Sequence, residues 1–222
     1  MSAYFITATG TDVGKTFVAA GLVRTLRAQG KAVRALKPVV SGFDMAKARA
    51  SDPGVLLEAM GEAVTQETVA RISPWRYAAP LSPDMAAARE GREIDFDALI
   101  AFCRKAAPGT LLVEGVGGVM VPLDARHTVL DWMAALQTPA ILVAGSYLGA
   151  ISHTLTAADA VMRAGVAIAA LVVNDSGDGA VPLADTAATL RRFLPATPIA
   201  TIPRVAQPGE ARADFARLAA LF

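Results

Sequence analysis

The residues best suited to chemistry stand at 9–16, where Thr-Gly-Thr-Asp-Val-Gly-Lys-Thr combines two glycines with a lysine and hydroxyls. An apolar, β-prone run over 3–8 precedes this stretch, and apolar residues at helical spacing follow over 16–29. A loop between a strand and a helix turns backbone N–H groups toward one point, which favours a bound phosphate. Lys15 adds a mobile positive charge, and Thr16 adds a hydroxyl suited to Mg²⁺. We interpret the stretch as a phosphate-binding loop, although the usual motif has glycine where Thr9 stands.

A second cation, Lys37, follows the apolar run 32–36 and precedes the turn-forming residues Ser41 and Gly42. Open α/β sheets bind ligands beyond the carboxyl ends of their strands. Lys37 is therefore placed for a phosphate site, and the alternative is an ordinary solvated lysine.

Two acidic residues are candidates for holding Mg²⁺. Glu114 ends the apolar run 110–113 and is followed by Gly-Val-Gly-Gly at 115–118, where backbone could approach a ligand closely. A glycine-rich turn with an exposed glutamate is the alternative. Asp52 precedes a proline and is typical of a helix N-cap, with metal binding as its alternative.

Later strand ends offer further candidates. The run 140–144 leads through Gly-Ser-Tyr-Leu-Gly into an amphipathic stretch over 151–163, whose free N–H groups near 150–152 could bind a carboxylate. Asn174 follows the run 166–173 and offers the donor and acceptor that a purine edge needs, or it simply closes a turn. Pro203-Arg204-Val205 follows the short run 199–202.

Strands that alternate with helices predict an α/β fold of the P-loop NTPase type, with a mainly parallel sheet and helices on both faces. We expect loops at 42–53 and, in ordered irregular form, at 73–83. The expected strands lie at 3–8, 32–36, 110–113, 140–144, 166–173 and 199–202, and the expected helices at 16–29, 54–60, 66–72, 84–90, 96–106, 129–136, 151–163, 183–194 and 210–221.

Composition narrows the class of protein. The 222 residues suit a single domain over 1–222. Lysine and arginine number 21 against 20 acidic residues, and this balance gives no sign of a nucleic-acid or membrane partner. No apolar run reaches the roughly 18 residues of a membrane span, and no secretory signal pattern opens the chain, so we expect a cytoplasmic protein. The single Cys103 lies in an apolar pattern typical of a structural thiol, and two histidines provide no histidine metal cluster.

Several motifs, in order along nearly the whole chain, resemble those of the dethiobiotin synthetase family. They are Thr-Asp-Val-Gly-Lys-Thr at 11–16, Lys-Pro-Val-Val-Ser-Gly at 37–42, Ser-Asp at 51–52, Leu-Ser-Pro at 81–83, Val-Glu-Gly-Val-Gly-Gly at 113–118, Leu-Gly-Ala-Ile-Ser-His at 148–153 and Asn-Asp at 174–175. The pattern departs from the family where Ala-Thr-Gly-Thr-Asp at 8–12 replaces Gly-Thr-Asp-Thr-Glu and where Ser152 replaces asparagine.

The resemblance implies a ligase of biotin biosynthesis, which uses ATP and Mg²⁺ to close 7,8-diaminononanoate (7,8-diaminopelargonate) and CO₂ into dethiobiotin. One amine of the substrate takes up CO₂ as a carbamate, which then receives the γ-phosphate of ATP. The second amine attacks the resulting carbamic-phosphoric anhydride, and ADP and phosphate are released. The family is homodimeric, with the substrate site near the subunit interface.

The resemblance also implies a role for each candidate residue. Lys15 and Lys37 would offset the charge of phosphate and carbamate, and Thr11 and Ser41 would orient the carbamate. Thr16, Asp52 and Glu114 would hold Mg²⁺. Nucleotide contacts would come from Asp12, Val13, Gly14, Lys15, Thr16, Phe17, Gly115, Val116, Gly117, Asn174, Asp175, Pro203, Arg204 and Val205, and the neighbouring subunit would hold the substrate carboxylate at Gly149, Ala150, Ile151 and Ser152.

Two other ATP-dependent classes share such a loop. A corrinoid amide ligase usually has an additional glutaminase domain with a nucleophilic cysteine, for which this chain is too short. A partition or positioning ATPase usually has another lysine early in the loop, where this chain has Thr9 and Gly10.

Overall fold

The centre of the protein is a six-stranded sheet in which every neighbouring pair of strands is parallel. The computed structural model describes residues 2–105, 109–175, 177, 181–205 and 211–221. All six predicted strands are present within it, in the order β2-β5-β1-β6-β7-β8. Their bounds are β1 (Ser2–Ala8), β2 (Val33–Leu36), β5 (Thr110–Glu114), β6 (Ala140–Ala144), β7 (Ile168–Asn174) and β8 (Ile199–Ile202).

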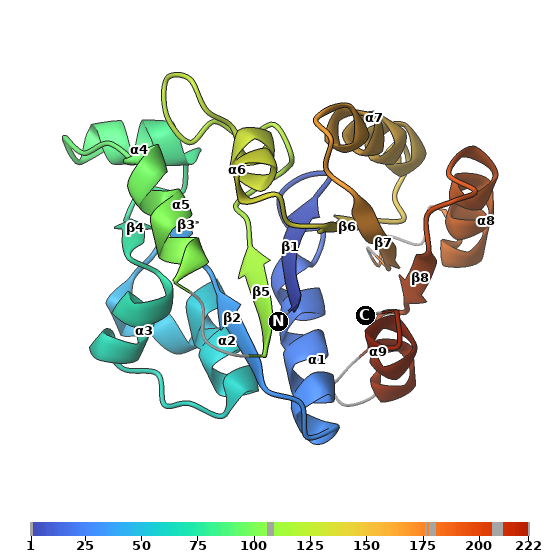
Figure 1. Ribbon diagram of the computed structural model, residues 1–222, viewed down its shortest axis with the longest axis horizontal. Helices are drawn as coiled ribbons and strands as arrows, with labels where there is room; N and C mark the ends of the chain where they lie inside the picture. Colours follow the sequence, from blue (N-terminus) through green and yellow to red (C-terminus); the bar gives the residue numbers. More distant parts are fainter. Residues whose placement is uncertain (1, 106–108, 176, 178–180, 206–210, 222) are drawn as a thin grey trace.

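Helices cover both faces of this sheet, as the alternating pattern predicts (Figure 1). Helices α1, α2 and α9 lie along one face, and α5, α6, α7 and α8 lie along the other. None of the helices in the described part of the chain is long and apolar enough to cross a membrane. The helices are α1 (Lys15–Ala28), α2 (Asp52–Met60), α3 (Gln66–Ile72), α4 (Pro83–Arg89), α5 (Phe96–Arg104), α6 (Val129–Leu136), α7 (Ala150–Arg163), α8 (Leu183–Phe193) and α9 (Arg212–Ala219).

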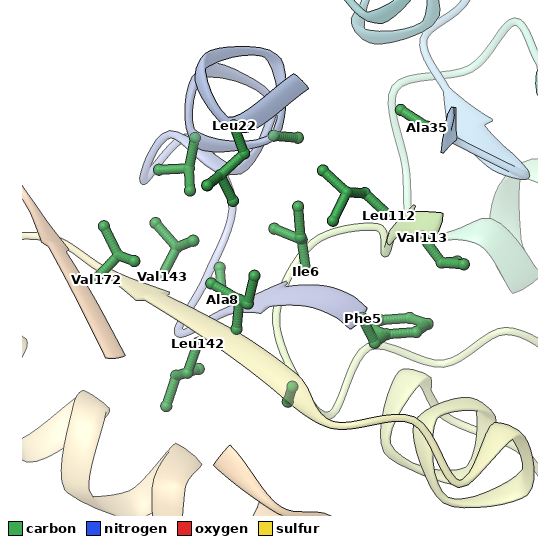
Figure 2. Packing of buried hydrophobic residues seen from close by; sticks show 14 of the residues in the cluster. Phe5, Ile6, Ala8, Leu22, Ala35, Leu112, Val113, Leu142, Val143 and Val172 are labelled. Atoms are coloured by element: carbon green, nitrogen blue, oxygen red, sulfur yellow. The ribbon is translucent and has the colours of Figure 1, made fainter. Parts of the chain in front are cut away.

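The core forms where β1 and β6 are buried on both faces, because parallel strands are covered by helices on each side. Figure 2 shows Ile6 of β1 below Leu22 of α1, with Val143 of β6 on the same side and Leu142 pointing away from α1. All four side chains are fully buried. The predicted structural thiol Cys103 also lies in this core, and burial raises its pKa to about 12.

A second, two-stranded parallel sheet was not predicted. It pairs β3 (Val39–Ser41) with β4 (Trp75–Tyr77), so the segment 73–83 is not wholly irregular. The segment 42–53, expected as a loop, contains a 3-10 helix, η1 (Met45–Ala50), and the first residues of α2. The strands β3 and β4 were missed because three-residue strands are stabilised by pairing with a distant segment, which leaves little local pattern. The 3-10 helix η1 was missed because a helix of six residues is too short for a clear apolar periodicity.

Helix α1 is also held from the side by α9, which lies on the same face of the sheet. The ring of Phe215 lies directly over Gly21, where an added Cβ would come within 2.1 Å of the ring. Phe215 also contacts Phe17 edge-on, with ring centroids 5.5 Å apart. The helix that begins at the phosphate-binding loop is therefore packed against both the sheet and the neighbouring helix α9.

Candidate active site

The loop between β1 and α1 has the backbone conformation that a phosphate-binding loop requires. Asp12 and Gly14 both have positive φ, 58° and 99°, and Gly14 is the N-cap of α1. The Thr9 N–H donates to Val143 O at 3.0 Å, which attaches the front of the loop to β6. With no side chain capping α1, its first N–H groups remain directed at the loop.

Asn174, at the end of β7, touches this loop from the side. Its side-chain amide donates to Val13 O at 3.1 Å. A Cβ at Gly14 would lie 2.3 Å from the Asn174 amide nitrogen, so only glycine fits there. This contact attaches Asn174 to the phosphate-binding loop, which the sequence did not predict, and the role of Asn174 toward adenine remains a prediction.

Lys37 joins the two sheets, and its main chain is held on both sides. Its N–H donates to Ile72 O at 3.1 Å, and its carbonyl accepts a hydrogen bond of 2.5 Å from Ser73 Oγ. Its side chain runs inward, where Nζ lies 2.7 Å from Glu114 Oε1, 2.9 Å from Asp52 Oδ2 and 2.8 Å from the Gly115 carbonyl oxygen. Lys37 is 2 % exposed, which excludes the solvated alternative.

The charges in this cluster perturb one another. Burial opposes the charged form of Lys37, but Glu114 and Asp52 outweigh it and raise the pKa of Lys37. Burial also opposes ionisation of Asp52, but Lys37 lowers its pKa overall. For Glu114, burial raises the pKa and the Lys37 ammonium counters that rise. Burial and the Lys37 charge together lower the pKa of Lys15 to about 8.

A cleft of about 840 Å³ opens beside these groups. The Lys15 Nζ donates to the Gly10 carbonyl at 3.1 Å inside the loop, and Thr16 Oγ1 donates to Glu114 Oε1 at 2.7 Å below the cleft. The predicted site residues that line the cleft are Thr11, Asp12, Gly14, Lys15, Thr16, Phe17, Lys37, Ser41, Asp52, Val116 and Gly117.

The oxygen atoms under the loop fit a hard divalent cation. Asp52 and Glu114 meet at the Lys37 ammonium, and Thr16 contacts the same carboxylate oxygen of Glu114. The second oxygen, Glu114 Oε2, is buried with no hydrogen-bond partner among the described residues. No group of three or more histidine, cysteine or acidic residues in the described chain could hold a metal alone. The Thr16 hydroxyl and the two carboxylates could supply part of the six-oxygen coordination of Mg²⁺, and nucleotide and water would supply the rest.

The structure corrects the local interpretation of Asp52. The N-cap of α2 is Ser51, whose Oγ accepts from the Gly54 N–H at 3.4 Å, and Asp52 is the first helical residue. The Asp52 carboxylate is thereby free of capping and reaches Lys37.

Other predicted residues lie outside the cleft. The Asp175 N–H donates to Ile202 O at 3.0 Å, which continues the pairing of β7 with β8, and Arg204 packs against Gly177, so the residues expected to border adenine are neighbours. The turn Gly149–Ser152 does not line the cleft, and Leu148 just before it is 84 % exposed.

Sequence reasoning missed part of the cleft wall. The residues that line the cleft but were not predicted include Pro80, Leu81, Ser82, Pro83, Val40 and Val121. The proline-rich composition of 74–83 and its Leu-Ser-Pro motif are the signals that could have identified this wall. Ser73 was missed as well, because its bond to Lys37 joins residues far apart in sequence.

Comparison with known proteins decides the family. A family model described as an AAA domain matches residues 2–212. The ATP-dependent dethiobiotin synthetase BioD of Acidiphilium cryptum is 56 % identical over 89 % of this chain and 91 % of its own length. The chain belongs to the dethiobiotin synthetase family. It is thus an enzyme, and a second dethiobiotin synthetase, from Methylobacterium nodulans, is 50 % identical over 86 % of this chain and 89 % of its own.

Solved structures support the P-loop NTPase fold of this dethiobiotin synthetase family member. The cell division ATPase MinD of Pyrococcus furiosus matches with a TM-score of 0.56 at 18 % identity, covering 100 % of this chain and 98 % of its own. MinD in the MinC:MinD complex of Aquifex aeolicus matches with a TM-score of 0.57 at 15 % identity, covering 98 % and 95 %. At these identities the likeness concerns the fold alone, and the sequence relatives favour neither the positioning ATPase nor the corrinoid ligase.

Proposed function

We propose that this enzyme uses ATP to close 7,8-diaminononanoate and CO₂ into dethiobiotin, with release of ADP and phosphate. The observation that supports this best is that Lys15, Lys37 and Asp52 line one cleft, with the buried Glu114 paired to Lys37 behind it. The two ammonium groups, together with Mg²⁺ held by the two acids, would neutralise a carbamate and a triphosphate at the place where they must meet. The relatives named as dethiobiotin synthetases support the same reaction.

The loop residues bind and orient the nucleotide. The N–H groups at the start of α1 and the Lys15 ammonium face the phosphates, and Gly14 allows the chain to turn beneath them. Asn174 holds the loop through Val13 O and, with Asp175 and 203–205, borders adenine. Thr16, Asp52 and Glu114 would hold Mg²⁺, which when bound neutralises charge on the phosphate oxygens.

The cleft residues position the carbamate. Ser41 Oγ is buried with no hydrogen-bond partner in the described chain, so it is available to a ligand in the cleft that it lines. Thr11 of the loop lines the same cleft, and Lys37, which also lines it, supplies positive charge. A carbamate oxygen attacks the γ-phosphorus as the bond to ADP breaks. The second amine then attacks the carbamate carbon, loses a proton and expels phosphate.

The substrate carboxylate would be bound by a neighbouring subunit. The segment 149–152, which is the N-cap and first residues of α7, has no side-chain cap on its backbone N–H groups, yet it does not line the cleft of its own chain. A homodimer that brings this turn to the opposite cleft would complete the site, and such an enzyme would act in the cytoplasm.

Turnover with labelled bicarbonate tests the function. With MgATP and 7,8-diaminononanoate, we expect labelled dethiobiotin and one ADP per product. Lys37→Met should abolish turnover, whereas Lys47→Met, the same change at an exposed lysine of η1, should leave it intact. Folded protein that makes no labelled dethiobiotin would disprove the proposal.

A further inference from the structure

The Lys37 ammonium occupies what we call the oxygen cage: Glu114 Oε1, Asp52 Oδ2 and the Gly115 carbonyl oxygen, at 2.7, 2.9 and 2.8 Å. An ammonium and a hard divalent cation use the same kind of oxygen ligand. Two of the three cage oxygens belong to the carboxylates assigned above to Mg²⁺. Lys37 therefore sits against the ligands that the metal requires.

The two cations compete for this position. Lys37 and Glu114 are 2 % and 1 % exposed, so little water screens the charges at their side of the cage, whereas Asp52, whose side chain is 42 % exposed, opens the cage to the cleft. Repulsion between like charges in such a site is large, and one cation must leave when the other binds. Without either cation, the buried Glu114 carboxylate would lack a counter-charge.

Only the side chain of Lys37 is able to move. Its main-chain N–H and carbonyl are both hydrogen bonded, to Ile72 O and Ser73 Oγ, and Ser73 is fully buried. The flexible four-carbon stem of a lysine allows its ammonium to change position about a fixed backbone. The cleft lined by Lys37, Thr11 and Ser41 lies next to the oxygen cage.

We propose that Lys37 stands in for the divalent cation in the free enzyme and leaves the oxygen cage for the cleft when the cation and nucleotide bind. This inference rests on the metal site of the proposed function. Under this proposal, Lys37 becomes available to offset the charge of the carbamate only after the cation and nucleotide have bound.

Binding of Mn²⁺ alone, measured by electron paramagnetic resonance without nucleotide, tests the competition. Lys37→Met should bind Mn²⁺ at least about tenfold more tightly than the unchanged protein, because the competing ammonium is gone. Lys15→Met removes the same charge from the same cleft, but Lys15 forms no ion pair with a described residue and bonds to Gly10 O. The affinity of Lys15→Met for Mn²⁺ should therefore differ from that of the unchanged protein by less than about threefold. Equal effects in both variants, or no gain in Lys37→Met, would overturn the proposal.

The second measurement uses the unchanged protein and does not depend on the variant folding. In ¹⁵N-lysine-labelled enzyme, the trapped Lys37 ammonium should give a resolved side-chain signal that shifts or is lost through faster proton exchange when Mg²⁺ and ADP are added. A signal that stays unchanged with Mg²⁺ and ADP bound, or a protein that binds no divalent ion, refutes the idea. Neither measurement involves turnover, so a failed dethiobiotin assay and a failed exchange of cations are separate results.

Discussion

The amide nitrogen of Asn174 occupies the space that a side chain on Gly14 would need, 2.3 Å from the position of its Cβ. The end of β7 thus determines which residue is accepted at the start of α1. Because the same amide donates to Val13 O, removing it both frees space and releases the loop.

This relationship predicts coupled effects on stability. Gly14→Ala should lower the free energy of unfolding by about 1–3 kcal/mol, since it adds a steric clash to a φ of 99°. In an Asn174→Ala background we expect that cost to shrink by at least about 0.5 kcal/mol in urea unfolding without nucleotide. Gly30→Ala is the control, because Gly30 also has positive φ, 74°, but nothing lies within 4 Å of its Cβ position. Strict additivity at Gly14 and Asn174 would show that the clash is relieved elsewhere.

Nucleotide binding should depend on the protonation of Lys15. Its pKa of about 8 in the free enzyme means that the ammonium is lost as the pH rises through this value. Since anionic phosphates bind the protonated form, affinity for ADP should be constant below pH 8 and fall about tenfold per pH unit above it. Calorimetric titration between pH 7 and 9.5 measures this. In Lys15→Arg, whose guanidinium stays charged, the affinity for ADP should no longer fall above pH 8. If it fell as steeply as in the unchanged protein, another group would be responsible for the pH dependence.

Breaking the buried pair should make stability depend on pH. Lys37→Met leaves Glu114 buried without its counter-charge, which costs about 3–5 kcal/mol where the carboxylate is ionised. Burial raises the pKa of Glu114 above 4.5, so the folded protein retains a proton that the unfolded chain has released. The loss of stability should therefore be small near pH 5 and grow as the pH rises toward 8.

Chemical denaturation of Lys37→Met and unchanged protein across this pH range gives the comparison. Arg49→Met is the control, since it removes an ion pair with Glu58 in which the arginine is 83 % exposed. Such a surface ion pair contributes about 0–1 kcal/mol to the free energy of unfolding, so Arg49→Met should cause only a small loss. A loss in Lys37→Met that does not vary with pH would mean that Glu114 keeps its charge.

Ser73 should act as a positioning residue for Lys37. Ser73→Ala removes the hydroxyl that donates to the Lys37 carbonyl. The Lys37 backbone should then be held less firmly, so its ammonium should be positioned less accurately, while the phosphate-binding loop is untouched. We expect kcat to fall by about tenfold or more with KM for ATP nearly unchanged, since misplacement of a reacting group affects the transition state most. Ser73→Thr keeps the hydroxyl and should restore most of kcat. Equal losses in both variants would mean that Ser73 serves packing alone.

The sequence predicted the large elements because their signals are local. Apolar runs mark the six strands of the main sheet, and the glycine-lysine stretch marks the loop between β1 and α1. The carboxyl ends of parallel strands share one edge, so Lys37 and Glu114 were expected on the same side. Direct contact between Lys37 and both acids could not be predicted, because it depends on side-chain paths through a packed interior.

The missed features depend on partners distant in sequence. β3 and β4 each span three residues and exist through their pairing with one another. Ser73 looks like an ordinary residue before a proline until its bond to Lys37 is seen. At 51–52, serine and aspartate are both good N-caps. In the structure Ser51 is the N-cap and Asp52 pairs with Lys37 instead, a contact with a residue that the local sequence does not reveal.

The contact of Phe215 with Gly21 bears on how the protein is made. α1 leaves the ribosome early and α9 late, so the face of α1 that Phe215 covers stays open through most of translation. Contacts between such distant segments form slowly because a long loop must close first. During synthesis, the helix that supports the nucleotide loop therefore keeps part of its surface uncovered until α9 has been made.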